Sequence, residues 1–123
     1  MKTPRVIPKA PKKKFNNETC RLIGIEYPKS LKEKDDAKRK YRTRIEYIDA
    51  DGHVVRKFIS FGTKGVPDYV DSGDPAVQIR NHKSMKGYDS IDKPNFYRMH
   101  LLNREKTLGD SYIALRKDLG LND

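Results

Sequence analysis

The chain has 123 residues, of which 35% are hydrophobic and 36% charged, and its formal net charge at pH 7 is +10. This length allows one domain with a modest core. No apolar run approaches the roughly 20 residues of a membrane span, and the single cysteine excludes an internal disulfide. The excess positive charge lies in the first 44 residues, because residues 45–123 contain twelve basic and twelve acidic side chains.

Residues 1–17 are predicted to form an extended basic arm. Prolines at positions 4, 8 and 11 fix φ and remove backbone donors, which excludes a helix or a central strand. The first 14 residues contain six basic and no acidic side chains, and a few apolar ones that could anchor the arm in grooves of a neighbouring protein. The residues expected to contact a partner are Arg5, Val6, Ile7, Lys12, Lys13, Lys14 and Phe15.

The first expected strand covers residues 20–27. Strict alternation would place Ile23, Ile25 and Tyr27 on its core face. The next segment, residues 29–40, is mostly charged and rich in lysine, which is typical of a solvated loop.

A β-hairpin is expected over residues 41–61. Polar and apolar side chains alternate over residues 41–49, and Gly52 supplies the positive φ that a tight turn needs. The return strand has apolar side chains on both faces, including Val54 and Phe58 on one of them. This pattern predicts a central strand that is covered on both sides.

Three later segments have helix-start signals, in which an acid or a threonine precedes a proline or an apolar run. These starts are Asp74-Pro75, Asp92-Lys93-Pro94 and Thr107-x-x-Asp110, and Gly120 is a suitable C-terminal cap. Residues 18–123 are therefore predicted to be a single small α+β domain: a three-stranded antiparallel meander followed by two or three short helices, with a lysine-rich loop at 29–40.

No motif points to catalysis, to a cofactor, to a small-molecule substrate or to a metal. The histidines at 53, 82 and 100 lack metal-site spacing. Residues 62–65, Gly-Thr-Lys-Gly, indicate a turn at a strand end, because a phosphate-binding loop needs a longer glycine spacing before a helix. Most of the aspartates, including Asp68 and Asp71, occur where turns and helix caps favour that side chain. We therefore expect a binding or structural protein, not an enzyme.

An alternative is a nucleic-acid-binding protein. The basic arm could neutralise phosphates, and a two-stranded ribbon can enter a major groove. Acids on the hairpin, such as Glu46, Asp49 and Asp51, give it an electrostatic field of mixed sign. Its aromatic side chains alternate as core residues do, which disfavours an exposed base-stacking platform. The hairpin residues that could contact nucleic acid are Arg42, Arg44, Arg56 and Lys57.

Residues 41–69 contain the pattern Y-x7-D-x-D-G-x4-K-x-I-x-F-G-x-K-G-x-x-D-Y. This pattern resembles a family of small basic proteins of nucleocytoplasmic large DNA viruses, the giant viruses of algae and amoebae. Residues 100–119, HLLNREKTLGDSYIALRKDL, are similar to the closing segment of that family. The chain departs from the family in having Arg80-Asn81-His82 where an Arg-His pair is usual, and in lacking tryptophan.

The resemblance implies a virion protein, a minor capsid component beneath the major shell that is assembled in the host cytoplasm. Its partners would be other capsid proteins, bound through the arm and the folded body. The excess charge would face acidic partners, the viral membrane surface or packaged DNA. The resemblance brings no catalytic residues with it.

Overall fold

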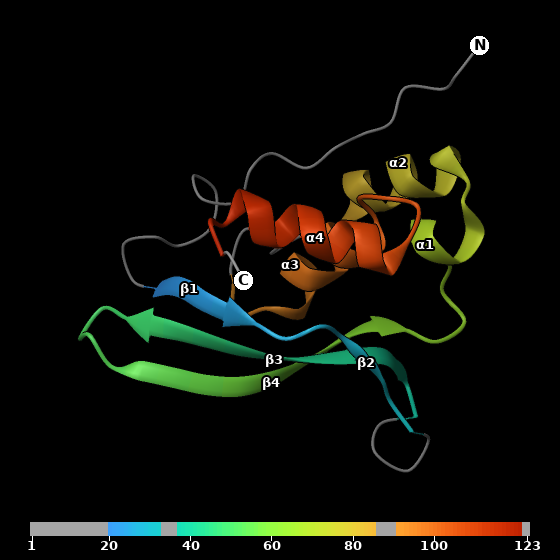
Figure 1. Cartoon of the computed structure of the whole chain (residues 1–123). Helices are drawn as coiled ribbons and strands as arrows, with labels where there is room; N and C mark the ends of the chain where they lie inside the picture. Colours follow the sequence, from blue (N-terminus) through green and yellow to red (C-terminus); the bar gives the residue numbers. More distant parts are fainter. Residues whose placement is uncertain (1–19, 33–36, 86–90, 122–123) are drawn as a thin grey trace.

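The computed structural model describes residues 20–32, 37–85 and 91–121, and the arm predicted over residues 1–17 lies outside this part. An antiparallel sheet forms one layer and the helices form a second layer on one of its faces (Figure 1). The predicted α+β class is confirmed. The strands are β1 (Cys20–Ile25), β2 (Lys29–Ser30), β3 (Arg39–Asp49) and β4 (Val54–Thr63). The helices are α1 (Tyr69–Ser72), α2 (Pro75–Ser84), α3 (Pro94–Tyr97), the π-helical η2 (Arg98–Leu102) and α4 (Leu108–Asp118).

Strand β3 is the centre of the sheet. It pairs with β4 along one edge, and with β1 and then β2 along the other edge. The predicted hairpin and the order of the meander are therefore confirmed, with β2 added. The prediction that the return strand is central and covered on both sides is wrong, because within the described residues β4 pairs with β3 alone. Its apolar side chains Val54 and Phe58 remain 55% and 59% exposed.

The core face of β1 also differs from the prediction. A β-bulge between Leu22 and Gly24 shifts the register against β3. An extra residue in a strand reverses the alternation on its two sides, so Leu22, and not Ile23, joins Ile25 on the buried face. Tyr27 lies on the same side as Ile25, as predicted, and its ring centroid is 5.0 Å from that of Tyr112 of α4, although about half of its surface stays exposed. The segment predicted as a loop over residues 29–40 is shorter than expected, since β2 begins at Lys29 and β3 at Arg39.

The predicted start signals place two of the helices correctly. The Asp74 side chain accepts a hydrogen bond from the Ala76 N–H at 2.9 Å at the start of α2, and Thr107 Oγ1 accepts from the Asp110 N–H at 3.1 Å at the start of α4. The third signal marks α3, but its N-cap is Lys93, which makes no side-chain capping bond. Helix α1 was not predicted from the sequence.

The core lies between the covered face of the sheet and the helices. Three aromatic rings pack among aliphatic side chains there, and the ring centroids of Phe61 of β4 and Tyr97 are 6.0 Å apart. The fully buried apolar residues at its centre are Ile45, Phe61, Phe96, Tyr97, Leu101, Leu102 and Leu115. No described element covers the opposite face of the sheet.

Candidate functional site

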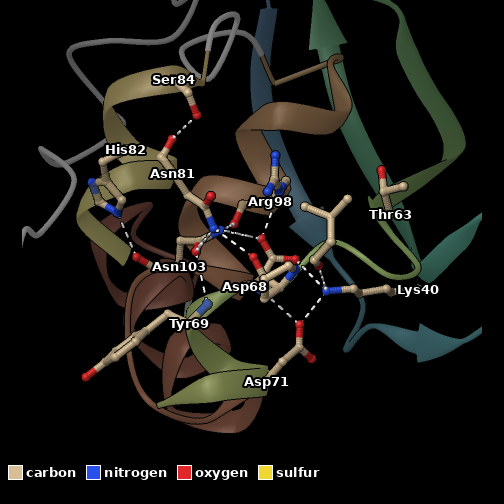
Figure 2. Close-up of polar contacts among 12 residues, drawn as sticks. Lys40, Thr63, Asp68, Tyr69, Asp71, Asn81, His82, Ser84, Arg98 and Asn103 are labelled. Carbon is tan, nitrogen blue, oxygen red and sulfur yellow. Dashed lines mark hydrogen bonds and ion pairs between the residues drawn. The ribbon is translucent and has the colours of Figure 1, made fainter. Parts of the chain in front are cut away.

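A buried carboxylate joins the sheet to the helices. Asp68 is 0% exposed and precedes α1. Its Oδ2 accepts a hydrogen bond from Lys40 Nζ at 2.8 Å. Its Oδ1 accepts from Arg98 Nε at 2.8 Å and from Asn103 Nδ2 at 2.9 Å (Figure 2). Two cations and an amide therefore compensate this buried charge, as burial of an ion requires.

Asn103, which follows η2, is the second centre of this cluster. Its Oδ1 accepts from the Tyr69 N–H and from Asn81 Nδ2, both at 3.0 Å. Asn81 Nδ2 also donates to the Pro67 carbonyl at 3.1 Å. The term "Asp68 cluster" is used below for Lys40, Asp68, Asp71, Asn81, Arg98 and Asn103.

Side chains of α2 satisfy two backbone carbonyls in the segment that follows η2. Gln78 Nε2 donates to the carbonyls of Asn103 at 3.1 Å and of Arg104 at 2.9 Å. His82 Nε2 lies 2.7 Å from the Asn103 carbonyl. Because a carbonyl can only accept, this nitrogen carries the proton, while burial lowers the pKa of His82. The segment after the π-helical turn is thus held in place by α2.

The chemistry of the Asp68 cluster is that of a structural ion pair. Burial alone would lower the pKa of Lys40, but hydrogen bonds to Asp68 and Asp71 outweigh it and raise the pKa above its ordinary value. Lys40 also donates to the Val66 carbonyl at 2.6 Å. An ammonium held in this way is a poor general base or nucleophile at neutral pH. A cleft of about 710 Å³ lies beside it, lined in part by Tyr41 and Lys64.

The sequence pattern around Asp68, Asp71 and Asp74 is typical of turn and cap residues. That interpretation holds for Asp71, which accepts from the Asp68 N–H at 3.0 Å, and for Asp74. Asp68, in addition, is a buried counter-ion, which its local sequence does not indicate. Asp68 and Asn103 are 35 positions apart, and no spacing rule connects them.

A second candidate site lies on the uncovered face of the sheet. Arg42 and Arg44 of β3 point to this face, and Arg56 of β4 lies opposite Glu46 in the register. Lys57 points to the other face, where its Nζ lies 5.8 Å from the centroid of the Tyr47 ring. The structure therefore brings together three of the four basic hairpin residues predicted from the sequence.

Phe58 lies among these arginines. The Arg42 guanidinium carbon is 4.5 Å from the centroid of the Phe58 ring. The prediction that the aromatic side chains of the hairpin are all core residues is wrong for Phe58, because it occupies the uncovered face. The term "open face" is used below for the polar and aromatic side chains of this surface: Arg21, Glu26, Lys29, Arg42, Arg44, Glu46, Arg56 and Phe58.

The hairpin turn contains the group best suited to a metal ion among the described residues. Ligand atoms of Asp49, Asp51 and His53 lie within 4.8 Å of one another. Asp49 Oδ1, however, accepts the N–H groups of Asp51 at 3.0 Å and His53 at 2.9 Å, so the turn itself accounts for this acid.

The predicted partner-binding residues of the arm, from Arg5 to Phe15, lie outside the described residues. None of the described helices is long and apolar enough to cross a membrane. No family model, no curated protein and no solved structure matches the chain.

Proposed function

We propose that the chain is a non-enzymatic structural protein of a virus particle, a minor capsid component that binds neighbouring capsid proteins through its folded body and its basic arm. The observation that carries this proposal is the contrast between a closed polar cluster and an open sheet face. The charges of the Asp68 cluster bond to one another. The open face leaves its arginines and Phe58 accessible to a partner.

The state of the polar groups supports a role without catalysis. Asp68 has no exposed surface and accepts hydrogen bonds on both of its oxygens. Lys40 is held as an ammonium by two carboxylates. Groups that are buried and mutually neutralised stabilise a fold, and they are poorly placed to exchange protons with a substrate.

The virion context comes from the resemblance of residues 41–69 and 100–119 to the viral family. These two segments meet where Asn103 donates to Asp68 at 2.9 Å, as parts of one packed unit would. A small body with an extended basic arm suits a protein that lies between larger neighbours and clamps one of them. The arm would contribute the lysines at 12, 13 and 14 and the apolar anchors Val6, Ile7 and Phe15.

The test is lysine-directed crosslinking and mass spectrometry on purified particles, followed by separation of shell from genome core. The expected result is recovery of the chain with the shell, with crosslinks from Lys12, Lys13 or Lys14 to other capsid proteins. Lys57, which packs over Tyr47 on the covered side of the sheet, provides an internal comparison and should crosslink less. Recovery with the genome core and never with the shell would contradict the proposal.

A further inference from the structure

We propose that the open face binds single-stranded nucleic acid, with phosphates on its arginines and a base stacked on Phe58. This inference goes beyond a place in the shell and does not depend on it. It starts from the charge of the face. Two carboxylates, Glu26 and Glu46, accompany five basic side chains there: Arg21, Lys29, Arg42, Arg44 and Arg56.

Both carboxylates are already paired within the face. Glu26 Oε1 lies 2.5 Å from Arg44 Nη2, and Glu46 Oε1 lies 3.2 Å from Arg56 Nε. Within the described part of the chain, Arg21, Lys29 and Arg42 have no ion-pair partner on this face. The surplus of three positive charges therefore faces solvent, where it can attract an anion.

The strand register gathers this surplus into one patch. Lys29 lies directly opposite Arg42 across the β2–β3 pairing, and Arg44 lies opposite Phe58 across the β3–β4 pairing. Cross-strand neighbours have Cβ atoms about 5 Å apart. Cations spaced in this way along one strand and its neighbours can contact successive phosphates of a single extended chain, and guanidinium groups bind phosphate oxygens through two parallel hydrogen bonds.

The exposed ring of Phe58 favours nucleic acid, which has bases that can stack on it, over a polyanion without bases as the ligand. Its ring is 59% exposed and Arg42 contacts it at 4.5 Å, so the aromatic surface lies within the basic patch. Sequence-tolerant binding of single strands combines a basic surface with an aromatic side chain on which a base stacks. A membrane surface would need a wider apolar area beside the cations than Phe58 and Val54 provide.

The architecture favours a single strand over a duplex. A hairpin that enters a major groove must be a free two-stranded ribbon. Here β1 and β2 occupy the second edge of β3, and helices cover the opposite face of the sheet (Figure 1). The surface offered is broad, and unstacked bases can lie along it as they do on other four-stranded sheets that bind RNA.

The test is fluorescence anisotropy of the full chain with a labelled oligothymidylate of about 10 nucleotides. Phe58→Ala keeps the net charge, including that of the arm, and should weaken binding about tenfold. Its matched control is Ile113→Ala, which removes an exposed apolar side chain from α4 and should leave the affinity unchanged. Phe58→Trp gives the chain its only tryptophan, which the oligonucleotide should quench as a base stacks on it.

A second pair of variants tests the charges. Arg42→Gln and Lys57→Gln each remove one cation from the hairpin, from opposite faces. Arg42→Gln should lower the slope of log affinity against log salt by about 0.7, and Lys57→Gln should leave it unchanged. Melting curves should show that all variants are folded, since these side chains lie at the surface or at its edge.

Several results would overturn the inference. Equal affinities of Phe58→Ala and Ile113→Ala, or equal salt slopes of Arg42→Gln and Lys57→Gln, would assign binding to the arm alone. Tighter binding of the matching duplex than of the single strand would also contradict it. If Phe58→Ala left oligonucleotide binding intact but removed crosslinks to the shell in particles, the open face would be a protein interface. Failure of the particle experiment alone would leave oligonucleotide binding standing.

Discussion

The Asp68 cluster and the open face are both rich in charged side chains. The charges are buried and paired in the Asp68 cluster, whereas a positive excess faces solvent on the open face. In the Asp68 cluster, a fully buried carboxylate is surrounded by Lys40, Arg98 and Asn103, and each group satisfies another. On the open face the arginines outnumber the acids and Phe58 remains in solvent. Removing a partner from the first region should cost stability. Removing a side chain from the open face should instead weaken the binding of oligonucleotide.

The largest effect on stability is expected for Asp68→Ala. The substitution leaves Lys40 and Arg98 partly buried without their common counter-ion, and loss of one partner from a buried pair costs about 3–5 kcal/mol. Urea unfolding followed by circular dichroism measures the change. Asp71→Ala is the control, because the side chain of Asp71 is partly exposed and a smaller loss is expected. Equal losses of stability in the two variants would mean that the burial of Asp68 does not determine how much the cluster stabilises the fold.

The next effect concerns Gly62, which lies where β4 contacts the Asp68 cluster. Its φ is +76°, and an added Cβ would lie 2.9 Å from Leu102 Cδ1 and 3.2 Å from Lys40 Cβ. The left-handed conformation and the crowding together should destabilise Gly62→Ala by about 3 kcal/mol.

Gly65 is the matched control for this substitution. It has a similar φ of +85°, but no atom lies within 4 Å of an added Cβ. Gly65→Ala should therefore cost only the conformational part, about 1 kcal/mol. Thermal or urea unfolding gives the free energy of unfolding of both variants, and the difference between them measures the crowding of Gly62 by Lys40 and Leu102. Equal losses of stability in the two variants would contradict that close packing.

A smaller, pH-dependent effect is expected at His100. Its Nδ1 has no hydrogen-bond partner among the described residues, and its ring packs 4.6 Å from that of Phe96. Burial, with help from Arg104 and His82, lowers the pKa of His100 to about 3. The unfolded chain takes up a proton near pH 6.5 while the folded chain does not, so stability falls as the pH drops through 6.5.

The loss from this one group between pH 7.5 and pH 5.5 should be about 1.4 kcal/mol. Urea unfolding at several pH values in this window, which lies above the titration of ordinary carboxylates, measures it. His100→Leu should flatten the pH profile by that amount. The control is Ile113→Ala, which removes an exposed side chain that does not titrate and should leave the profile as it is. An unchanged profile for His100→Leu would mean that this ring is protonated in the folded protein.

Local sequence signals were enough to predict much of the fold. The Asp74 cap, the Thr107 cap and the Gly52 turn were all placed correctly, because each depends on a few neighbouring residues. The bulge after Leu22 was missed, since it is decided by pairing with β3 and not by alternation within β1. Nor does apolar character on both faces of a strand show that both faces are covered, as Phe58 demonstrates.

The two candidate sites differ in the same respect. The arginines of the open face were identified from the sequence, because alternation along one hairpin is enough to place Arg42 and Arg44 on a common face. The Asp68 cluster was not, because its members come from β3, α1, α2, η2 and the segments that follow β4 and η2. Contacts between residues this far apart are set by how the helices dock on the sheet, which no local pattern records.

The smallest effect on stability is expected on the open face itself. Arg42→Gln removes a half-buried side chain and Phe58→Ala an exposed one, and the contact between them is worth about 0.5–1 kcal/mol at a solvated site. The free energy of unfolding should therefore change by no more than about 1 kcal/mol in either variant, as measured by urea unfolding. A loss as large as that of Asp68→Ala would show that Phe58 and Arg42 hold the fold together, and the open face would then be a second structural cluster. A small loss of stability, combined with weaker oligonucleotide binding, would show that the Asp68 cluster controls stability and that the open face controls binding.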